Sequence, residues 1–88
     1  MTVPFRDPLP EGFSRRVFRA APGREISLEH ARDAIVVVEA GELELVCKAG
    51  GCRRFARGSM IPIGRLPVAH LRSVGSCPLV LVAVARDR

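Results

Sequence analysis

The sequence is poor in aromatic residues, since its 88 residues include four Phe and neither Trp nor Tyr. Nucleobases and sugar rings are bound by stacking on aromatic platforms, so this scarcity weighs against binding of that kind. The interior has to be built from Val, Leu, Ile and Ala, which dominate a hydrophobic fraction of 48%. That fraction is ample for a core, and a chain of this length supports one domain.

Lysine is almost absent, because only Lys48 stands among 14 basic residues and the others are all Arg. The net charge of +5 would suit a nucleic acid, a membrane surface or an anionic ligand. The arginines are scattered, however, and their closest groups, at 15–19 and 53–57, are not long basic runs. We interpret them as solvated strand faces and predict neither a nucleic-acid partner nor a membrane partner.

The sequence also lacks a long apolar segment. No run approaches the roughly 20 residues of a membrane span, and residues 1–8 do not contain the apolar stretch of a signal peptide. The cysteines Cys47, Cys52 and Cys77 are odd in number, so they cannot all be paired in disulfides within the chain. Together these observations predict a cytoplasmic protein whose thiols are reduced.

From residue 15 onward, the chain contains short apolar segments separated by Gly and Pro. Residues 1–14 are rich in proline and are expected to form an extended N-terminal arm. The expected strands lie at 16–20, 24–28, 33–40, 42–46, 52–56, 59–63, 68–73 and 78–85. Their regular spacing predicts an all-β domain over residues 15–88, a small antiparallel β-barrel or jelly roll of about eight strands.

Two of the expected strands are apolar on both faces. They include residues 35–38, which are Ile and Val, and residues 79–84, which are mostly Leu and Val. Strands of this type are usually covered on both sides. The interior of so small a barrel covers one side, and the other side needs either the N-terminal arm or another subunit. We therefore expect a homodimer.

Three segments resemble the cupin superfamily in their order and spacing. Residues 35–45 are similar to the strand–glycine–strand element of cupins, with Gly41 between the strands. Residues 58–63 are similar to the cupin stretch that usually begins Gly-Asp, and residues 73–79 are similar to its Asn-x-Gly-x-x-Pro-Leu ending. The resemblance covers nearly all of the expected domain and implies a small cupin-like barrel.

The metal motif of cupins is degenerate in this chain. Alignment of the first cupin motif places its three ligand positions on Leu28, His30 and Ala34, so one ligand in three remains. In the second motif the His position falls on Ala69, and His70 is one residue out of register. A divalent metal needs three or four donors that converge on one point. We therefore expect no bound metal and no cofactor.

The offset of one residue matters because strand side chains alternate between two faces. In this phase Ala69 and Leu71 face the interior, whereas His70 and Arg72 face outward. The expected lining of the interior consists of Leu28, His30, Ala34, Val36, Ala69 and Leu71. Arg65 and Arg72 are candidate contacts for an anionic ligand, and solvated surface positions are the competing interpretation.

Cys47 and Cys52 stand at the two ends of an expected hairpin loop at 48–51. With four residues in the loop, the two thiols face each other and form a candidate redox pair. Reduced, partly buried cysteines are the competing interpretation.

The preferred function is that of a non-enzymatic cupin-like domain that binds a small organic ligand or serves as a sensor or accessory module. An apolar interior without metal ligands motivates this choice. One alternative is a metal-free or weakly metal-dependent cupin enzyme of the isomerase or lyase type, in which His30 acts beside Arg65 or Arg72. The other alternative is a purely structural, dimeric interaction module.

Overall fold

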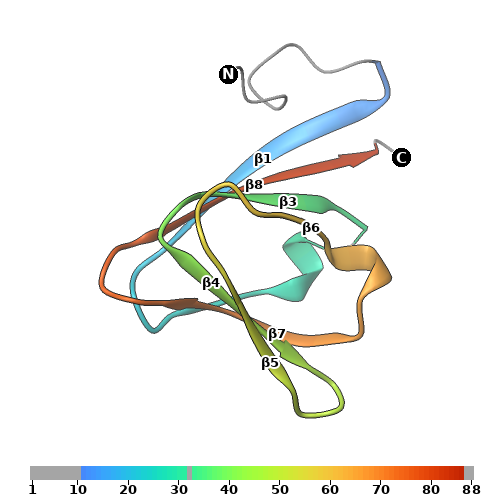
Figure 1. Cartoon of the computed structure of the whole chain (residues 1–88). Helices are drawn as coiled ribbons and strands as arrows, with labels where there is room; N and C mark the ends of the chain where they lie inside the picture. The colour runs from blue at the N-terminus through green and yellow to red at the C-terminus, as the bar shows by residue number, and fades with distance from the viewer. Residues whose placement is uncertain (1–10, 32, 87–88) are drawn as a thin grey trace.

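The computed structural model describes residues 11–31 and 33–86, and it describes only the backbone of His30. These residues form two antiparallel sheets, each of four strands (Figure 1). Sheet A has the order β1-β8-β3-β6, and sheet B has the order β2-β7-β4-β5. The strands are β1 (Phe13–Ala20), β2 (Glu25–Ile26), β3 (Ile35–Ala40), β4 (Glu42–Cys47), β5 (Cys52–Phe55), β6 (Met60–Pro62), β7 (Val68–Val74) and β8 (Leu79–Arg86).

The prediction of an all-β fold with about eight antiparallel strands is confirmed. The strand pairs of the described residues fall into two separate sheets, so the barrel is not closed. Every connection except the β4–β5 hairpin leads from one sheet to the other. This alternation is the crossing pattern of a jelly roll.

Two expected strands end early and are followed by 3-10 turns. Only Glu25 and Ile26 pair in the second one, and the chain then makes a 3-10 turn, η2 (Leu28–His30). The sixth strand ends at Pro62, where a second 3-10 turn, η3 (Ile63–Arg65), begins. In the described ranges, no helix has the length and hydropathy that crossing a membrane requires.

Most of the expected arm, residues 1–10, lies outside the described residues. Its last two residues, Phe13 and Ser14, belong to β1 and pair with Arg86 and Ala85 of β8. The sheet therefore starts two residues before the expected domain boundary.

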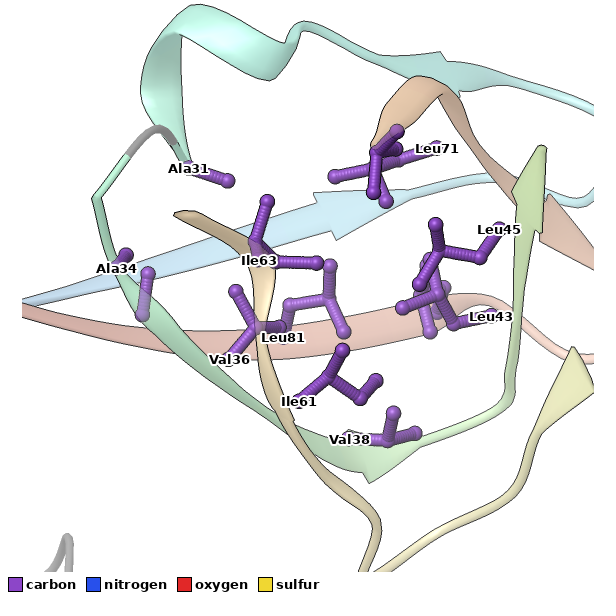
Figure 2. Close-up of a cluster of buried hydrophobic side chains, with 13 residues drawn as sticks. Ala31, Ala34, Val36, Val38, Leu43, Leu45, Ile61, Ile63, Leu71 and Leu81 are labelled. Atoms are coloured by element: carbon purple, nitrogen blue, oxygen red, sulfur yellow. The ribbon is translucent and has the colours of Figure 1, made fainter. Parts of the chain in front are cut away.

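The inner faces of the two sheets meet in one apolar core (Figure 2). Alternate residues of each strand supply it, as in Val36 and Val38 of β3 and Leu43 and Leu45 of β4. The fully buried large side chains are Leu43, Ile61, Leu71, Leu79, Leu81, Val36 and Val38, together with Ser73. Leu, Ile and Val side chains thus fill the space between the sheets.

The outer face of sheet A also contains a row of apolar side chains. The strand register places Val17, Val82, Val37 and Met60 in one row across β1, β8, β3 and β6. At the two ends of this row, Val17 is 51% exposed and Met60 is 55% exposed. Ile35, one row away on β3, is 41% exposed. Between them, Val37 is 6% exposed and Val82 is 7% exposed, so the middle of the row is buried and only its ends are open to solvent.

Candidate functional site

A cavity of about 340 Å³ opens at the end of the sandwich where η2, η3 and the start of β7 come together. Figure 1 shows these two turns beside each other at one end of the sheets. We call this cavity the end pocket. Its lining consists of Leu28, Asp33, Lys48, Ile63, Gly64, Leu66, Val68 and Ala69.

The β-bulge at the start of β7 places Ala69 in the end pocket. Val46 pairs with His70 and Cys47 pairs with Val68, so Ala69 has no residue opposite it on β4. A bulge of this kind turns neighbouring side chains toward the same face. Val68 is buried in the core, and Ala69, which is only partly buried, lines the pocket.

Asp33 reaches the end pocket from the turn between η2 and β3. Its φ of 62° is the only positive value among the described residues that are not glycine. This left-handed region is rare outside glycine, although Asp tolerates it better than most residues. A Cβ atom on Gly64 would lie 2.9 Å from the Cα atom of Asp33, so only glycine allows η3 to pack this closely. Two uncommon backbone features therefore hold this carboxylate at the pocket.

Lys48 reaches the same pocket from the β4–β5 hairpin. The N–H of Gly50 donates to the carbonyl oxygen of Cys47 at 2.9 Å, and the N–H of Cys47 donates to Gly51 at 2.7 Å. With Gly50 at a φ of 100°, this is a tight turn followed by a G1 bulge. The N–H of Lys48 donates to the carbonyl oxygen of Pro67 at 2.8 Å, which ties the hairpin to the segment before β7.

A second, smaller cavity of about 250 Å³ adjoins the end pocket. Asp33 and Gly64 line both cavities, and Arg65, an expected anion contact, lines the smaller one. Arg65 is therefore brought close to the end pocket, although it does not line it.

The structure separates the expected interior residues into two groups. Leu28 and Ala69 meet in the end pocket. Val36 and Leu71 have no exposed surface and belong to the packed core, and Ala34, 1% exposed, belongs to the core as well. The backbone of His30 lies in η2, next to Leu28, and its side chain is outside the described residues.

No three His, Cys, Asp or Glu side chains within the described ranges are grouped so that they could hold a metal ion. Three of the positions to which the resemblance to cupins would assign metal ligands carry the apolar side chains of Leu28, Ala34 and Ala69. These side chains have no donor atom for a metal.

His70 and Arg72 lie on the outer face of sheet B, as the alternation along β7 predicts. The carboxylate of Glu25 is 3.6 Å from Arg72 Nη2 and 4.0 Å from His70 Nδ1. On the other side of Arg72, Glu44 lies 3.7 Å from Arg72 Nη1, and it also lies 3.7 Å from Arg54 Nε. Glu25, Arg72, Glu44 and Arg54 thus form a charge ladder of alternating sign across all four strands. An anion at His70 and Arg72 would meet the carboxylate of Glu25.

The expected facing arrangement of Cys47 and Cys52 is wrong. Val46, not Cys47, pairs with Cys52, because the turn and its bulge use only three loop residues. Adjacent strand residues point to opposite faces, so the two cysteines do not face each other. Both are free thiols, with Cys47 partly buried and Cys52 exposed.

The two charged residues of the end pocket, Asp33 and Lys48, were not among the candidates from sequence. Lys48 had one signal, its being the only lysine in the chain. No sequence pattern marked Asp33, because its position depends on the packing of η3. A search of protein-family models and a search of curated proteins both found no match to the chain.

Proposed function

We propose that this chain is a small cupin-like domain that binds a small organic ligand in the end pocket without a metal cofactor. One observation carries the proposal. Leu28 and Ala69, which the resemblance to cupins aligns with metal-ligand positions, meet in a pocket that also has one acidic and one basic side chain. The exposed surface of this pocket is more polar than apolar. Small-molecule sites use a few polar groups to fix the orientation of the ligand.

The fold supports the cupin part of this proposal. The strand–glycine–strand element at Gly41 connects sheet A to sheet B, as a jelly roll requires. The core residues Val36, Leu71 and Ala34 are close-packed, so binding belongs at the end of the sandwich and not between the sheets. A sensor or accessory role requires a binding site for a ligand and does not require catalytic residues.

A thermal-shift screen with small organic acids, amines, amino acids and sugar phosphates tests ligand binding. A ligand at 100 times its Kd stabilises the folded state by about 2.7 kcal/mol. For a domain of this size, that corresponds to a rise in Tm of about 10 °C or more. The substitution Ala69→Leu narrows the end pocket and should abolish the shift.

The matched control is Ala56→Leu, because Ala56 is exposed between β5 and β6 and does not line the end pocket. It should keep the ligand-induced shift. A screen without any stabilising compound would refute ligand binding, and a shift that survives Ala69→Leu would move the ligand to another site. Stoichiometric metal in elemental analysis of the purified protein would refute the metal-free assignment.

A second proposal concerns the outer face of sheet A, which we assign to contact with a second copy of the chain. Four strands at a spacing of about 4.8 Å and strand lengths of about 20 Å give a flat area of roughly 400 Å² per copy. The accessible area of a corrugated sheet is larger. The flat areas of two copies add up to roughly 800 Å², while a specific interface buries at least about 1,000 Å². Val37 and Val82 are already buried in the single chain, so the exposed ends of the row, Val17 and Met60, have to supply the apolar contact.

A symmetric pair can keep the arginines of this face apart. Arg15 and Arg19 pair with Val84 and Val80 of β8, so they lie on the outer face at the β1 edge. The β6 edge carries Met60 there and no arginine. A two-fold axis parallel to the strands lays β1 of one copy over β6 of the other. The arginines then lie over apolar side chains and apart from one another.

A further inference from the structure

We propose that the open edge of β5 binds an acidic segment of polypeptide in an extended conformation, which adds a strand to sheet B. This surface is separate from those of the two proposals above, because residues 52–57 do not line the end pocket and β5 does not belong to sheet A. The inference follows from the backbone groups of β5 and from the arginines beside them.

One side of the β5 backbone is unpaired within the described part of the chain. β5 is the last strand of sheet B and pairs with β4. The hydrogen bond from the N–H of Cys47 to the carbonyl oxygen of Gly51 fixes the phase of this ladder. Antiparallel strands alternate between hydrogen-bonded and non-hydrogen-bonded pairs. Arg53 therefore turns its N–H and C=O groups toward β4, whereas those of Cys52 and Arg54 point away from it.

This edge is also accessible. The first three residues of β5 are exposed, and Phe55 is partly buried because it packs against the core. Figure 1 shows the β4–β5 hairpin at the periphery of the sandwich. β5 contains no proline, and its register with β4 is continuous. Proline and bulges are two devices that keep foreign strands off a sheet edge, and β5 lacks both. An extended chain can therefore pair with its outward N–H and C=O groups.

The charge along the edge decides which chain fits. Residues 52–57 include three arginines and no acidic residue. Arg54 has Glu44 as a partner at 3.7 Å, but Arg53 and Arg57 form no ion pair with any residue that the structure describes. Like charges on neighbouring strands repel each other and opposite charges attract. The β5 strand of a second copy would set arginine against arginine, whereas an acidic strand places carboxylates beside exposed guanidinium groups.

Backbone and charge together favour a polypeptide over other anions. A nucleic acid or a sugar phosphate can pair with the arginines, but it has no regular row of N–H and C=O groups to match those of the strand. An acidic polypeptide uses both features of the edge. Because the guanidinium groups are exposed, salt should screen their attraction and weaken the binding.

Fluorescence anisotropy with a labelled peptide of Glu-Glu-Thr-Thr repeats tests the inference. This order places Glu on both faces of an added strand. One control peptide has Lys in place of Glu. The other has N-methyl groups on two adjacent central residues, so that neither of its edges keeps a full set of N–H groups. We expect the acidic peptide to bind at least about tenfold more tightly than each control, and less tightly at high salt. Equal binding of either control, or no binding of the acidic peptide, would refute the proposal.

Two substitutions of Cys52 separate the backbone from the side chain. Cys52→Pro removes an N–H group that β4 does not use, and an edge strand tolerates proline at such a position. It should weaken the binding of the acidic peptide about fivefold or more, because one outward donor is lost. Cys52→Ala keeps that donor and should bind the peptide as the unmodified protein does. Circular dichroism checks that both variants keep the sheet. Equal affinities of the two folded variants would contradict strand addition.

The contribution of charge needs its own pair of variants. Arg53→Gln combined with Arg57→Gln should weaken the binding of the acidic peptide. The matched control, Arg16→Gln combined with Arg24→Gln, changes the net charge equally at exposed positions in β1 and directly before β2. It should keep the affinity, and an equal loss in both double variants would refute a local effect at β5. A loss with Arg53→Gln and Arg57→Gln but none with Cys52→Pro would assign the arginines to another kind of anion, such as a nucleic acid, and overturn the proposal.

Discussion

Of the buried residues that the structure describes, Ser73 alone carries a polar side chain. Both backbone groups of Ser73 form hydrogen bonds. Its N–H donates to the carbonyl oxygen of Arg24, and its carbonyl oxygen accepts from the N–H of Gly23, both at 2.8 Å. Its hydroxyl oxygen is buried and forms no hydrogen bond within the described part of the chain. The backbone of Ser73 therefore contributes hydrogen bonds to the fold, whereas its buried, unpaired hydroxyl group lowers the stability of the folded state.

Ser73→Ala should stabilise the protein. The substitution removes an unsatisfied buried hydroxyl without changing the backbone, and the expected gain is about 1 kcal/mol. Tm should rise by roughly 4–8 °C, measured by differential scanning calorimetry. Ser76→Ala, at an exposed position, is the control and should change Tm little. A fall in Tm for Ser73→Ala would mean that the hydroxyl has a partner in solution.

At the scale of elements, Gly41 is the whole connection between β3 of sheet A and β4 of sheet B. Its φ of 78° lies in the left-handed region. A Cβ atom there would lie 2.6 Å from the carbonyl oxygen of Pro78 and 2.8 Å from the Cα atom of Leu79. Both obstacles are backbone atoms, which cannot move aside as a flexible side chain does.

Gly41→Ala should therefore destabilise the domain strongly. Left-handed strain and the forced shift of the chain before β8 together cost about 3 kcal/mol or more. Urea unfolding followed by circular dichroism measures this loss. Gly51→Ala is the matched control, because Gly51 has no atom within 4 Å of the added Cβ and no left-handed φ. Equal stability of the two variants would contradict the close approach at Gly41.

The features that the sequence predicted are those that depend on neighbours along the chain. Gly41 stands between two apolar segments, and the alternation of Leu71 and Arg72 marks the two faces of β7. Pairing across strands was harder to predict. The G1 bulge at Gly50 shortened the hairpin loop by one residue and so separated Cys47 from Cys52. Local patterns contain no information about such a shift, since it depends on the choice of turn.

The end pocket could be predicted only in part for a related reason. Leu28 and Ala69 were expected inside because aligned motifs placed them there. Asp33 and Lys48 come from segments with no shared pattern, and they meet because η3 packs on Asp33 and the hairpin bonds to Pro67. Contacts of this type exist only after both sheets have assembled.

At the scale of the whole molecule, the proposed contact between two copies concerns the outer face of sheet A. The proposal of a symmetric pair predicts that the protein elutes and scatters light with twice the mass of one chain. Met60→Glu places a charge in the exposed apolar row and should convert the pair to monomers. Size-exclusion chromatography with light scattering measures this change.

Val46→Glu is the control for this experiment, because Val46 pairs with Cys52 and His70 on the opposite sheet, and it should remain a dimer. A chain that lacks residues 1–10 should also remain a dimer if a second copy covers the face. A monomeric wild-type protein would refute the pair. Monomers that dimerise only after removal of residues 1–10 would assign the face to that segment instead.

The position of β8 has a consequence for the order in which this protein can fold. β8 is the last strand in the chain, yet it lies between β1 and β3 in sheet A. Until residues 79–86 have been synthesised, β1 has no neighbour in the sheet, and the core lacks Leu79, Leu81 and Ala83. Folding during synthesis must therefore wait for the end of the domain, and the dominance of distant pairings makes it slow compared with helical proteins of equal length.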